Sequence, residues 1–318
     1  MKPAARQFVL LTLGIAGAIC AGAGLLNYLV DPYNRFGRNR MGVYISAERE
    51  SKTTDVRRYP HNALLLGNSR MAMIPVERLN GFRFFNAAFG GGTAAEAYYF
   101  LDHYATTEDL VVLGVELGQY AGPSSEPDPF VPSSWTAILN NLLNVKTVEY
   151  SFRTIAGHMS GESPSLRKDG SFNSTRWFEL NDRPNPAVRD LQLERLKPAY
   201  AGFSGPVLGG MDFYIRIAQC LQQRHIACVV LLPPLHEAVA KAVHNSFSAM
   251  AAYQAWRREL GSIFPNVVDL SLGPYCAAEN FFQADPVHFK PEVGVRMLNQ
   301  EVIPMAIQVV RKNRAGKL

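Results

Sequence analysis

The chain has 318 residues, of which 47% are hydrophobic and 19% are charged. This length can bury one large core or two small ones, and the even composition argues against a disordered chain or a fibrous repeat. The formal net charge of +5 does not indicate nucleic-acid binding, because the basic residues are scattered apart from a C-terminal cluster at Arg311, Lys312, Arg314 and Lys317. We therefore expect no nucleic-acid partner.

The first elements in chain order are a membrane segment and a stem. Residues Phe8–Val30 carry no charged side chain, and the run exceeds the about 20 apolar residues that cross a bilayer. Lys2 and Arg6 precede it, which favours a cytoplasmic N-terminus, although three arginines in the stem after the run weaken that preference. We predict a single-pass protein of the inner (cytoplasmic) membrane, with residues 8–30 in the lipid bilayer and the body in the periplasm.

Two kinds of processing compete with an uncleaved anchor. The sequence Ala21-Gly22-Ala23 resembles a signal-peptidase site, but apolar residues continue beyond it, which favours the anchor. A lipoprotein signal at Cys20 is disfavoured because the bulky Ile19 precedes it. The other cysteines, Cys220, Cys228 and Cys276, are too few and too spread out for a disulfide framework, so buried thiols or one oxidised pair remain open.

Beyond the stem, short apolar runs alternate with helical patterns. The expected strands are Ala63–Leu66, Phe82–Ala88, Leu110–Val115, Ala227–Leu232 and Asn266–Leu270. The expected helices are Ala94–Tyr104, Met211–Arg224, Ser246–Leu260 and Pro291–Val310, the last bent near Pro304. This alternation predicts an α/β fold of three α/β/α layers, in which a mainly parallel sheet lies between helices.

The domain organisation follows from the same pass along the chain. Residues 1–40 form the membrane anchor and stem, and residues 41–318 form one catalytic domain. Residues 122–206 hold many of the prolines and several polar stretches, so we expect an insertion or lid there rather than a second domain.

Three places put reactive or unusual residues after an expected strand or before a helix. In Gly67-Asn68-Ser69-Arg70, a buried strand runs into a glycine that permits a sharp turn, and a helix starting at the serine would direct N–H groups at an anion. Taken alone, this segment is better explained as an ordinary Asn-Ser helix cap. At Gly90-Gly91-Gly92, the backbone can approach a ligand closely, although a flexible connection has the same composition.

The third place is Asp285-Pro286-Val287-His288, just before the last helix. An aspartate and a histidine three residues apart in a turn can face each other. The carboxylate then fixes the histidine tautomer while the second ring nitrogen accepts a proton from a serine. The spacing also occurs by chance, and His288 alone would fit a structural or surface histidine.

Taken together and in this order, the motifs resemble the SGNH (GDSL-like) hydrolase superfamily. Gly67-Asn68-Ser69 is similar to its first block, Gly91 to the glycine of its second block, and Asp285-x-x-His288 to its last block. The resemblance covers about residues 60–120 and 225–310. It implies an SGNH hydrolase-like, flavodoxin-like fold and a catalytic triad of Ser69, His288 and Asp285, with an oxyanion hole formed by Ser69 and Gly91.

One departure concerns the third block, which normally supplies an asparagine to the oxyanion hole. Here the strand leads into Glu116-Leu117-Gly118-Gln119-Tyr120. We expect the Gln119 amide to substitute, with Tyr120 as the alternative. Asn68, Arg70 and His236 are candidate pocket residues, and His236 also fits a surface loop.

The resemblance extends to bacterial envelope proteins related to the alginate O-acetylation machinery. It implies a serine esterase or O-acyltransferase that acts on acyl, chiefly acetyl, esters of an envelope polysaccharide or other glycan. A multi-span membrane acyltransferase is the implied partner, and no cofactor or metal is implied. The principal alternative is a catalytically inert SGNH fold that binds polysaccharide or scaffolds an assembly, which the missing asparagine favours. A nucleotide-binding Rossmann protein is a third reading, disfavoured by the glycine spacing and the anchor.

Overall fold

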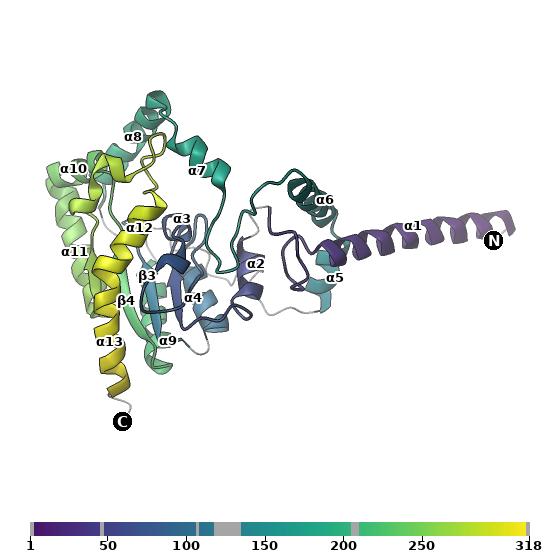
Figure 1. Cartoon of the computed structure of the whole chain (residues 1–318), viewed down its shortest axis with the longest axis horizontal. Helices are drawn as coiled ribbons and strands as arrows, with labels where there is room; N and C mark the ends of the chain where they lie inside the picture. The colour runs from purple at the N-terminus through teal and green to yellow at the C-terminus, as the bar shows by residue number, and fades with distance from the viewer. Residues whose placement is uncertain (1–2, 45–47, 106–107, 118–134, 205–209, 316–318) are drawn as a thin grey trace.

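The computed structural model describes residues 3–44, 48–105, 108–117, 135–204 and 210–315 (Figure 1). At its centre is a parallel sheet with the order β2-β1-β3-β4-β5. Each strand lies within one of the five predicted apolar runs. The strands are β1 (Ala63–Leu66), β2 (Phe84–Asn86), β3 (Leu110–Gly114), β4 (Ala227–Leu232) and β5 (Val267–Asp269).

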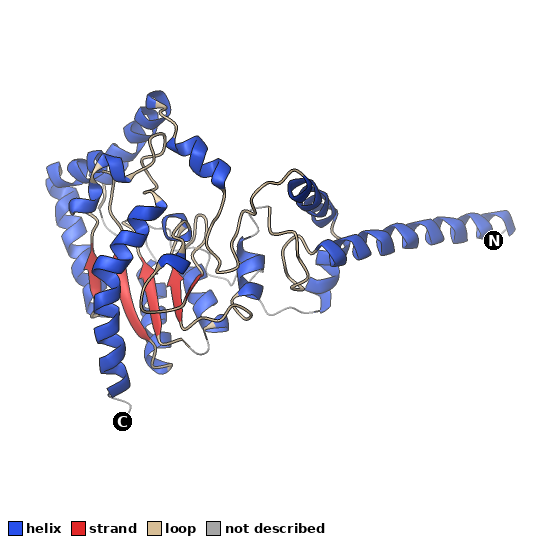
Figure 2. Ribbon diagram, viewed as in Figure 1, coloured by secondary structure: helices blue, strands red, loops and turns tan. Residues whose placement is uncertain are grey.

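Both faces of the sheet are covered by helices, so consecutive strand residues enter two separate cores (Figure 2). Leu64 and Leu66 of β1 pack under α4 (Ala94–Tyr104), α9 (Gly210–Gln223) and α11 (Phe247–Ile263). Leu65 packs under α3 (Ser69–Ala72), α12 (Pro291–Met297) and α13 (Ile303–Ala315). The predicted three-layer α/β/α fold with a flavodoxin-like strand order is thus confirmed.

The strand order places a topological switch point between β1 and β3. From β1 the chain moves to β2 on one side and then to β3 on the other side. In open parallel sheets, the loops at the carboxyl ends of the two strands diverge at such a point and leave a crevice. Ser69 follows β1 directly, so it lies at this point.

The last helix has the predicted irregularity. A π-helical segment, Leu298–Val302, joins α12 to α13 immediately before Pro304. Proline has no N–H and its ring collides with the carbonyl four residues earlier, and a wider turn accommodates both effects. The helix continues to Ala315, beyond the predicted end at Val310.

Several helices were not predicted individually. They are α2 (Glu48–Asp55) and α10 (Glu237–Asn245), together with α5 (Trp135–Leu143), α6 (Val145–Met159), α7 (Thr175–Asp182) and α8 (Pro186–Ala201) in the proposed insertion. The described residues between β3 and β4 add no strand to the sheet. The sequence of α2, ERESKTTD, lacks an apolar stripe, and the residues that it buries are polar or charged.

The N-terminal helix α1 (Pro3–Val30) projects away from the body (Figure 1). Its most apolar 18-residue stretch has a mean hydropathy of 2.2 and contains no buried residue, so α1 is long and apolar enough to cross a membrane. Only its C-terminal end is covered, where α5 and α6 pack beside it. There the buried Asn27 donates to the Leu142 carbonyl at 2.8 Å and accepts from Ser151 Oγ at 2.9 Å, so its amide joins the three helices.

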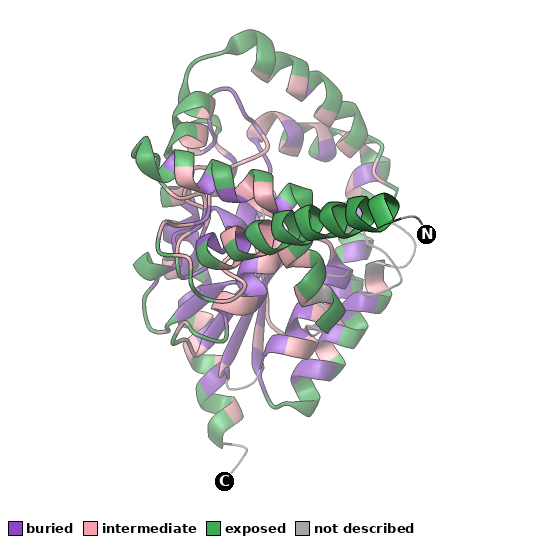
Figure 3. Ribbon diagram, turned by 90° about the vertical axis from the view of Figure 1, so that its right-hand side faces the viewer, coloured by how far each residue is buried: buried purple, intermediate pink, exposed green. Residues whose placement is uncertain are grey.

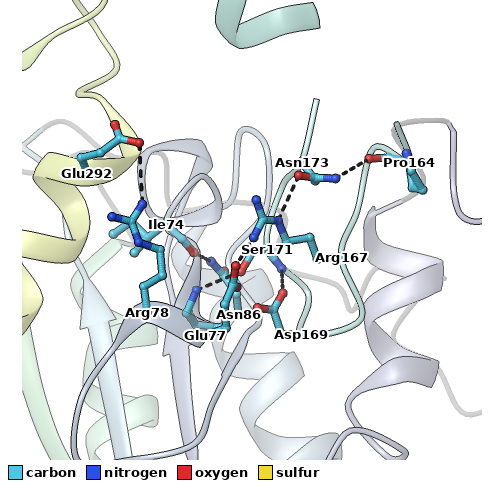
Figure 4. Close-up of polar contacts among 11 residues, drawn as sticks. Ile74, Glu77, Arg78, Asn86, Pro164, Arg167, Asp169, Ser171, Asn173 and Glu292 are labelled. Carbon is cyan, nitrogen blue, oxygen red and sulfur yellow. Dashed lines mark hydrogen bonds and ion pairs between the residues drawn. The ribbon is translucent and has the colours of Figure 1, made fainter. Parts of the chain in front are cut away.

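A buried amide on β2 holds the helix that follows β1. Asn86 Nδ2 lies 2.9 Å from the carbonyl oxygen of Met71 and 3.0 Å from that of Ile74. The main-chain N–H of Asn86 donates to the main-chain carbonyl of Asp169 at 2.7 Å. Figure 4 shows this amide between Ile74, just beyond α3, and the 167–173 segment, where Asp169 Oδ1 accepts from the Ser171 N–H at 2.9 Å. The position of α3 therefore depends on β2 and on a segment from the proposed insertion.

We predict that Asn86→Ala lowers the free energy of unfolding by about 2–3 kcal/mol, because buried carbonyls lose their donor. Denaturant unfolding of the full chain followed by tryptophan fluorescence measures the change. Asn313→Ala is the control, since this exposed amide makes one bond, to the His225 carbonyl. Equal effects of the two substitutions would contradict the role given to Asn86.

Candidate active site

The turn after β1 presents Ser69 at the start of α3. Gly67 has φ of +145°, and a Cβ there would lie 2.7 Å from Met71 Cγ, so the turn requires glycine. Asn68 is the N-cap, and its Oδ1 accepts from the Arg70 N–H at 3.1 Å. The cap is therefore Asn68, whose side chain turns to the helix, and the Ser69 hydroxyl remains available for other contacts.

Ser69 meets His288 and Asp285 from the opposite end of the chain. Ser69 Oγ lies 2.9 Å from His288 Nε2, and His288 Nδ1 lies 2.7 Å from Asp285 Oδ2. The second carboxylate oxygen accepts from the Val287 N–H at 2.8 Å, which fixes the aspartate within its turn. The three side chains thus form a continuous hydrogen-bonded chain, with the histidine between an acid and a hydroxyl.

The surroundings of Asp285 favour its charged form. Burial alone would raise the pKa of this carboxyl group, but the hydrogen bond from His288, the positive charge of that ring when protonated, and two backbone N–H groups outweigh burial. The pKa of Asp285 therefore lies below its usual value. The carboxylate is thereby suited to holding a proton on Nδ1 of His288, which leaves Nε2 to face Ser69.

Helix α7 packs against the loop that carries the histidine. The Trp177 ring lies perpendicular to that of His288, with centroids 5.5 Å apart, and the Asn181 carbonyl accepts from the Ala284 N–H at 2.9 Å. The indole limits the rotation of the imidazole and covers one side of it. No sequence motif indicated Trp177, because its only link to His288 is through space.

The glycine-rich loop lies directly against the turn of Ser69. The Phe89 N–H donates to the Gly67 carbonyl at 3.1 Å, and a Cβ on Gly92 would lie 2.6 Å from that oxygen. Gly91 is exposed, has φ of +62°, and its N–H finds no acceptor among the described residues. An oxyanion hole needs a free N–H beside the serine, and the position of the Gly91 N–H relative to Ser69 stays a prediction.

Helix α2 contacts this loop through three polar side chains. Glu48 accepts from the Gly90 N–H at 2.6 Å, Arg49 donates to the Gly90 carbonyl at 3.3 Å, and Lys52 donates to Ala88. Lys52 is fully buried, and burial lowers its pKa to about 8 although Glu48 and Asp169 oppose the shift. A charged helix that follows the stem, with no sequence motif, therefore contacts the glycine loop through three polar side chains.

Arg70 is an internal residue. Its side chain is 3% exposed, pairs with Glu116 after β3 at 3.3 Å, donates to the Pro234 carbonyl after β4, and lies over the Phe289 ring at 5.2 Å. It therefore ties α3 to two strand ends and to the loop of His288. Arginine suits this place because its planar, permanently charged group can donate in several directions.

The proposed third donor of the oxyanion hole is not located. Gln119, like Tyr120, lies outside the residues that the structure describes. The described chain after β3 ends at Leu117, just beyond Glu116. The role assigned to Gln119 therefore remains a prediction.

His236 lies at the end of β4, as predicted, and is the N-cap of α10. Its Nδ1 accepts from the Ala238 N–H at 3.2 Å, and burial lowers the pKa of the ring. The neutral ring thus carries its proton on Nε2. His236 borders a cavity of about 330 Å³ between α8 and the loop of His288, lined also by Asn185, Arg189, Asp190, Glu237, Phe282 and Gln283.

The four cysteines are free thiols: Cys220 and Cys276 are buried, Cys228 is half-buried and Cys20 is exposed on α1. Within the described ranges, no group of three or more histidine, cysteine, aspartate or glutamate side chains is placed to hold a metal ion.

No protein-family model and no curated protein sequence matches the chain. Among solved structures, it is similar to the lipase/acylhydrolase from Enterococcus faecalis, with a TM-score of 0.34 and 13% sequence identity. The match covers 79% of this chain and 96% of that one. The likeness is distant, so the functional assignment rests on the site geometry.

The lowered pKa of Asp285 predicts a specific acid dependence of stability. Its contribution is complete above the unfolded-state pKa of about 3.9 and disappears as the pH falls through the lower folded-state value. Asp285→Asn should remove this part of the acid destabilisation, measured by urea unfolding between pH 6 and pH 3. Asp190→Asn, on an exposed carboxylate, is the control. Identical acid dependence in the wild type and Asp285→Asn would contradict the assignment.

Proposed function

We propose that the chain is a membrane-anchored serine esterase or O-acyltransferase of the SGNH type. The observation that carries the proposal is the hydrogen-bonded chain of Ser69, His288 and Asp285 at the topological switch point of the sheet. The serine and the histidine are 219 positions apart, so neither local sequence nor one secondary-structure element accounts for their meeting. An ordinary helix cap at Asn68-Ser69 would not need His288, and a purely structural His288 would not need Ser69. Neither alternative accounts for the contact between the two side chains.

In the proposed reaction, Ser69 Oγ attacks an ester carbonyl while His288 Nε2 takes its proton. The N–H groups of Ser69 and Gly91, with the Gln119 amide, stabilise the oxyanion. Collapse of this intermediate expels an alcohol, which takes the proton from His288, and leaves an ester of Ser69. Water or a sugar hydroxyl then attacks this ester with His288 as base, and the serine is regenerated.

The choice between hydrolysis and transfer depends on how well water is excluded. We assign this role to the insertion, residues 122–206, whose helix α7 already covers one side of His288 through Trp177. The cavity beside His236 is lined by polar groups, and the His236 ring carries a donor N–H at Nε2. Such a lining suits a hydroxyl-rich ligand. Acetylated envelope glycan is therefore the proposed substrate, with α1 in the inner membrane, the body in the periplasm and a multi-span acyltransferase as partner.

We predict that Ser69→Ala and His288→Ala each abolish labelling by a fluorophosphonate probe and lower hydrolysis of small acetyl esters by about 10³-fold or more. Combining them should cost little more, because the two act as a unit. Ser248→Ala, an exposed serine in α11, is the control. Esterase activity that survives Ser69→Ala would refute the mechanism. An intact triad without activity on any ester would favour the alternative of a catalytically inert protein that binds polysaccharide or scaffolds an assembly.

The third oxyanion donor has its own test. If Gln119 supplies it, Gln119→Ala should lower kcat by about 10²-fold to 10³-fold, because the donor acts chiefly in the transition state. Steady-state kinetics on an acetyl ester measures kcat and KM separately, and Gln119→Asn should retain part of the rate. A change confined to KM would exclude this role.

A further inference from the structure

Large apolar side chains are exposed around the base of α1. Outside α1, the described residues include eleven large hydrophobic side chains that are exposed, and six of these belong to α5 and α6. We call these six the α5–α6 surface: Trp135, Leu139, Leu143, Val145, Phe152 and Met159. Single exposed apolar residues are ordinary, but a group of this size marks an interaction surface.

The six residues form two helical stripes. Trp135, Leu139 and Leu143 are spaced four apart along α5, which contains no charged residue. The three on α6 are spaced seven apart, while Thr147, Ser151 and Thr154 of α6 are buried. On α6 the exposed stripe is apolar and the buried side is polar, the reverse of a helix that packs its apolar face on a core. On α5 the exposed stripe is apolar too, and among the described residues of this helix the only polar ones exposed beside it are the uncharged Thr136 and Asn140.

The stripe on α5 lies on the side of the uncovered part of α1. The Leu142 carbonyl meets α1 at Asn27, whereas the Leu143 side chain approaches Gly24, where a Cβ would lie 3.6 Å from Leu143 Cδ2. Gly24 precedes Asn27 by one helical turn, so the exposed stripe is nearer to the free, apolar end of α1. Figure 3 looks onto the face from which α1 projects, and α1 is coloured as exposed along nearly all of its length.

The height of this contact along α1 matches a bilayer surface. At 1.5 Å per residue, the distance from Phe8 to Gly24 is about 24 Å, close to the far edge of a hydrocarbon core about 30 Å thick. Tryptophan favours that boundary, and Trp135 is 80% exposed. Because α5 carries no charged residue, it can enter this boundary without removing a charge from water.

We propose that the α5–α6 surface lies in the outer interface of the bilayer that α1 crosses. The proposal rests on the anchoring role given to α1 under the proposed function. Asn27 joins the three helices, so they enter the membrane surface as one unit. A single spanning helix leaves the body free to tilt, whereas this second contact holds the active site at a set height and orientation above the lipid.

The test uses the full chain in phospholipid vesicles, with Cys20→Ser to remove the exposed thiol. An environment-sensitive fluorophore is attached at Leu139→Cys, or at Trp135→Cys if the first variant does not fold. Phe247→Cys on α11, which is 91% exposed, is the water-facing control, and Ile15→Cys on α1 reports insertion of the anchor. Nitroxide-bearing lipids and aqueous iodide are the two quenchers.

We expect the label on α5 to lose most of its fluorescence to the nitroxide lipids and little to iodide, with the reverse at position 247. Quenching at 139 by iodide alone, with the label at 15 in lipid, overturns this proposal and leaves the anchor intact. A label at 15 that remains in water overturns the anchor itself. Quenching at 139 that varies with the protein-to-lipid ratio assigns the surface to a second copy, and also overturns lipid contact.

Discussion

The parallel pairing of β1 and β3 is the constraint on which the site depends. Because both strands end at the same edge of the sheet and the chain diverges from β1 in two directions, the turn of Ser69 is left open on one side. The glycine loop after β2 lies against that turn on one flank, and the loop of His288 closes the other. Each catalytic candidate is thus a loop residue placed by a rigid strand or helix end.

Polar contacts, more than apolar packing, hold these loops in register. Asn86 supports α3, Arg70 connects α3 to the ends of β3 and β4, and Lys52 donates into the glycine loop. Each is buried, and a buried charge or amide is costly unless its hydrogen bonds are made. Such groups add little net stability, but they penalise alternative arrangements of the loops, which is the requirement at a site where small displacements matter.

The segment that follows α1 also contributes to the candidate site. Helix α2 follows the stem and contacts the glycine loop through Glu48, Arg49 and Lys52. At the other end of the stem, Asn27 joins α1 to α5 and α6 of the insertion, and the insertion in turn reaches His288 through Trp177. Among the described residues, α1, α5 and α6 are therefore connected to the loops of the candidate active site.

The sequence by itself determined the elements whose signal is local. The five apolar runs, the helix over Ala94–Tyr104, the turn at Gly67 and the break before Pro304 follow from hydrophobic periodicity and from the backbone properties of glycine and proline. Motif order and resemblance brought Ser69 and His288 forward as partners. Their hydrogen bond depends on the tertiary structure, because it requires the carboxyl end of β1 and the loop before α12 to meet.

Only the tertiary structure decided which side chains contact the loops around Ser69 and His288. Arg70, a candidate pocket residue beside Ser69, is buried, and the ends of β3 and β4 supply its partners. Helix α2 has no apolar periodicity, and its contacts with the glycine loop are made to backbone groups about 40 positions away in the chain. The sequence of α2 therefore does not indicate these contacts. Trp177 reaches His288 across more than 100 positions. Such contacts leave no local pattern, because their free energy comes from groups that are distant in the chain and adjacent only after folding.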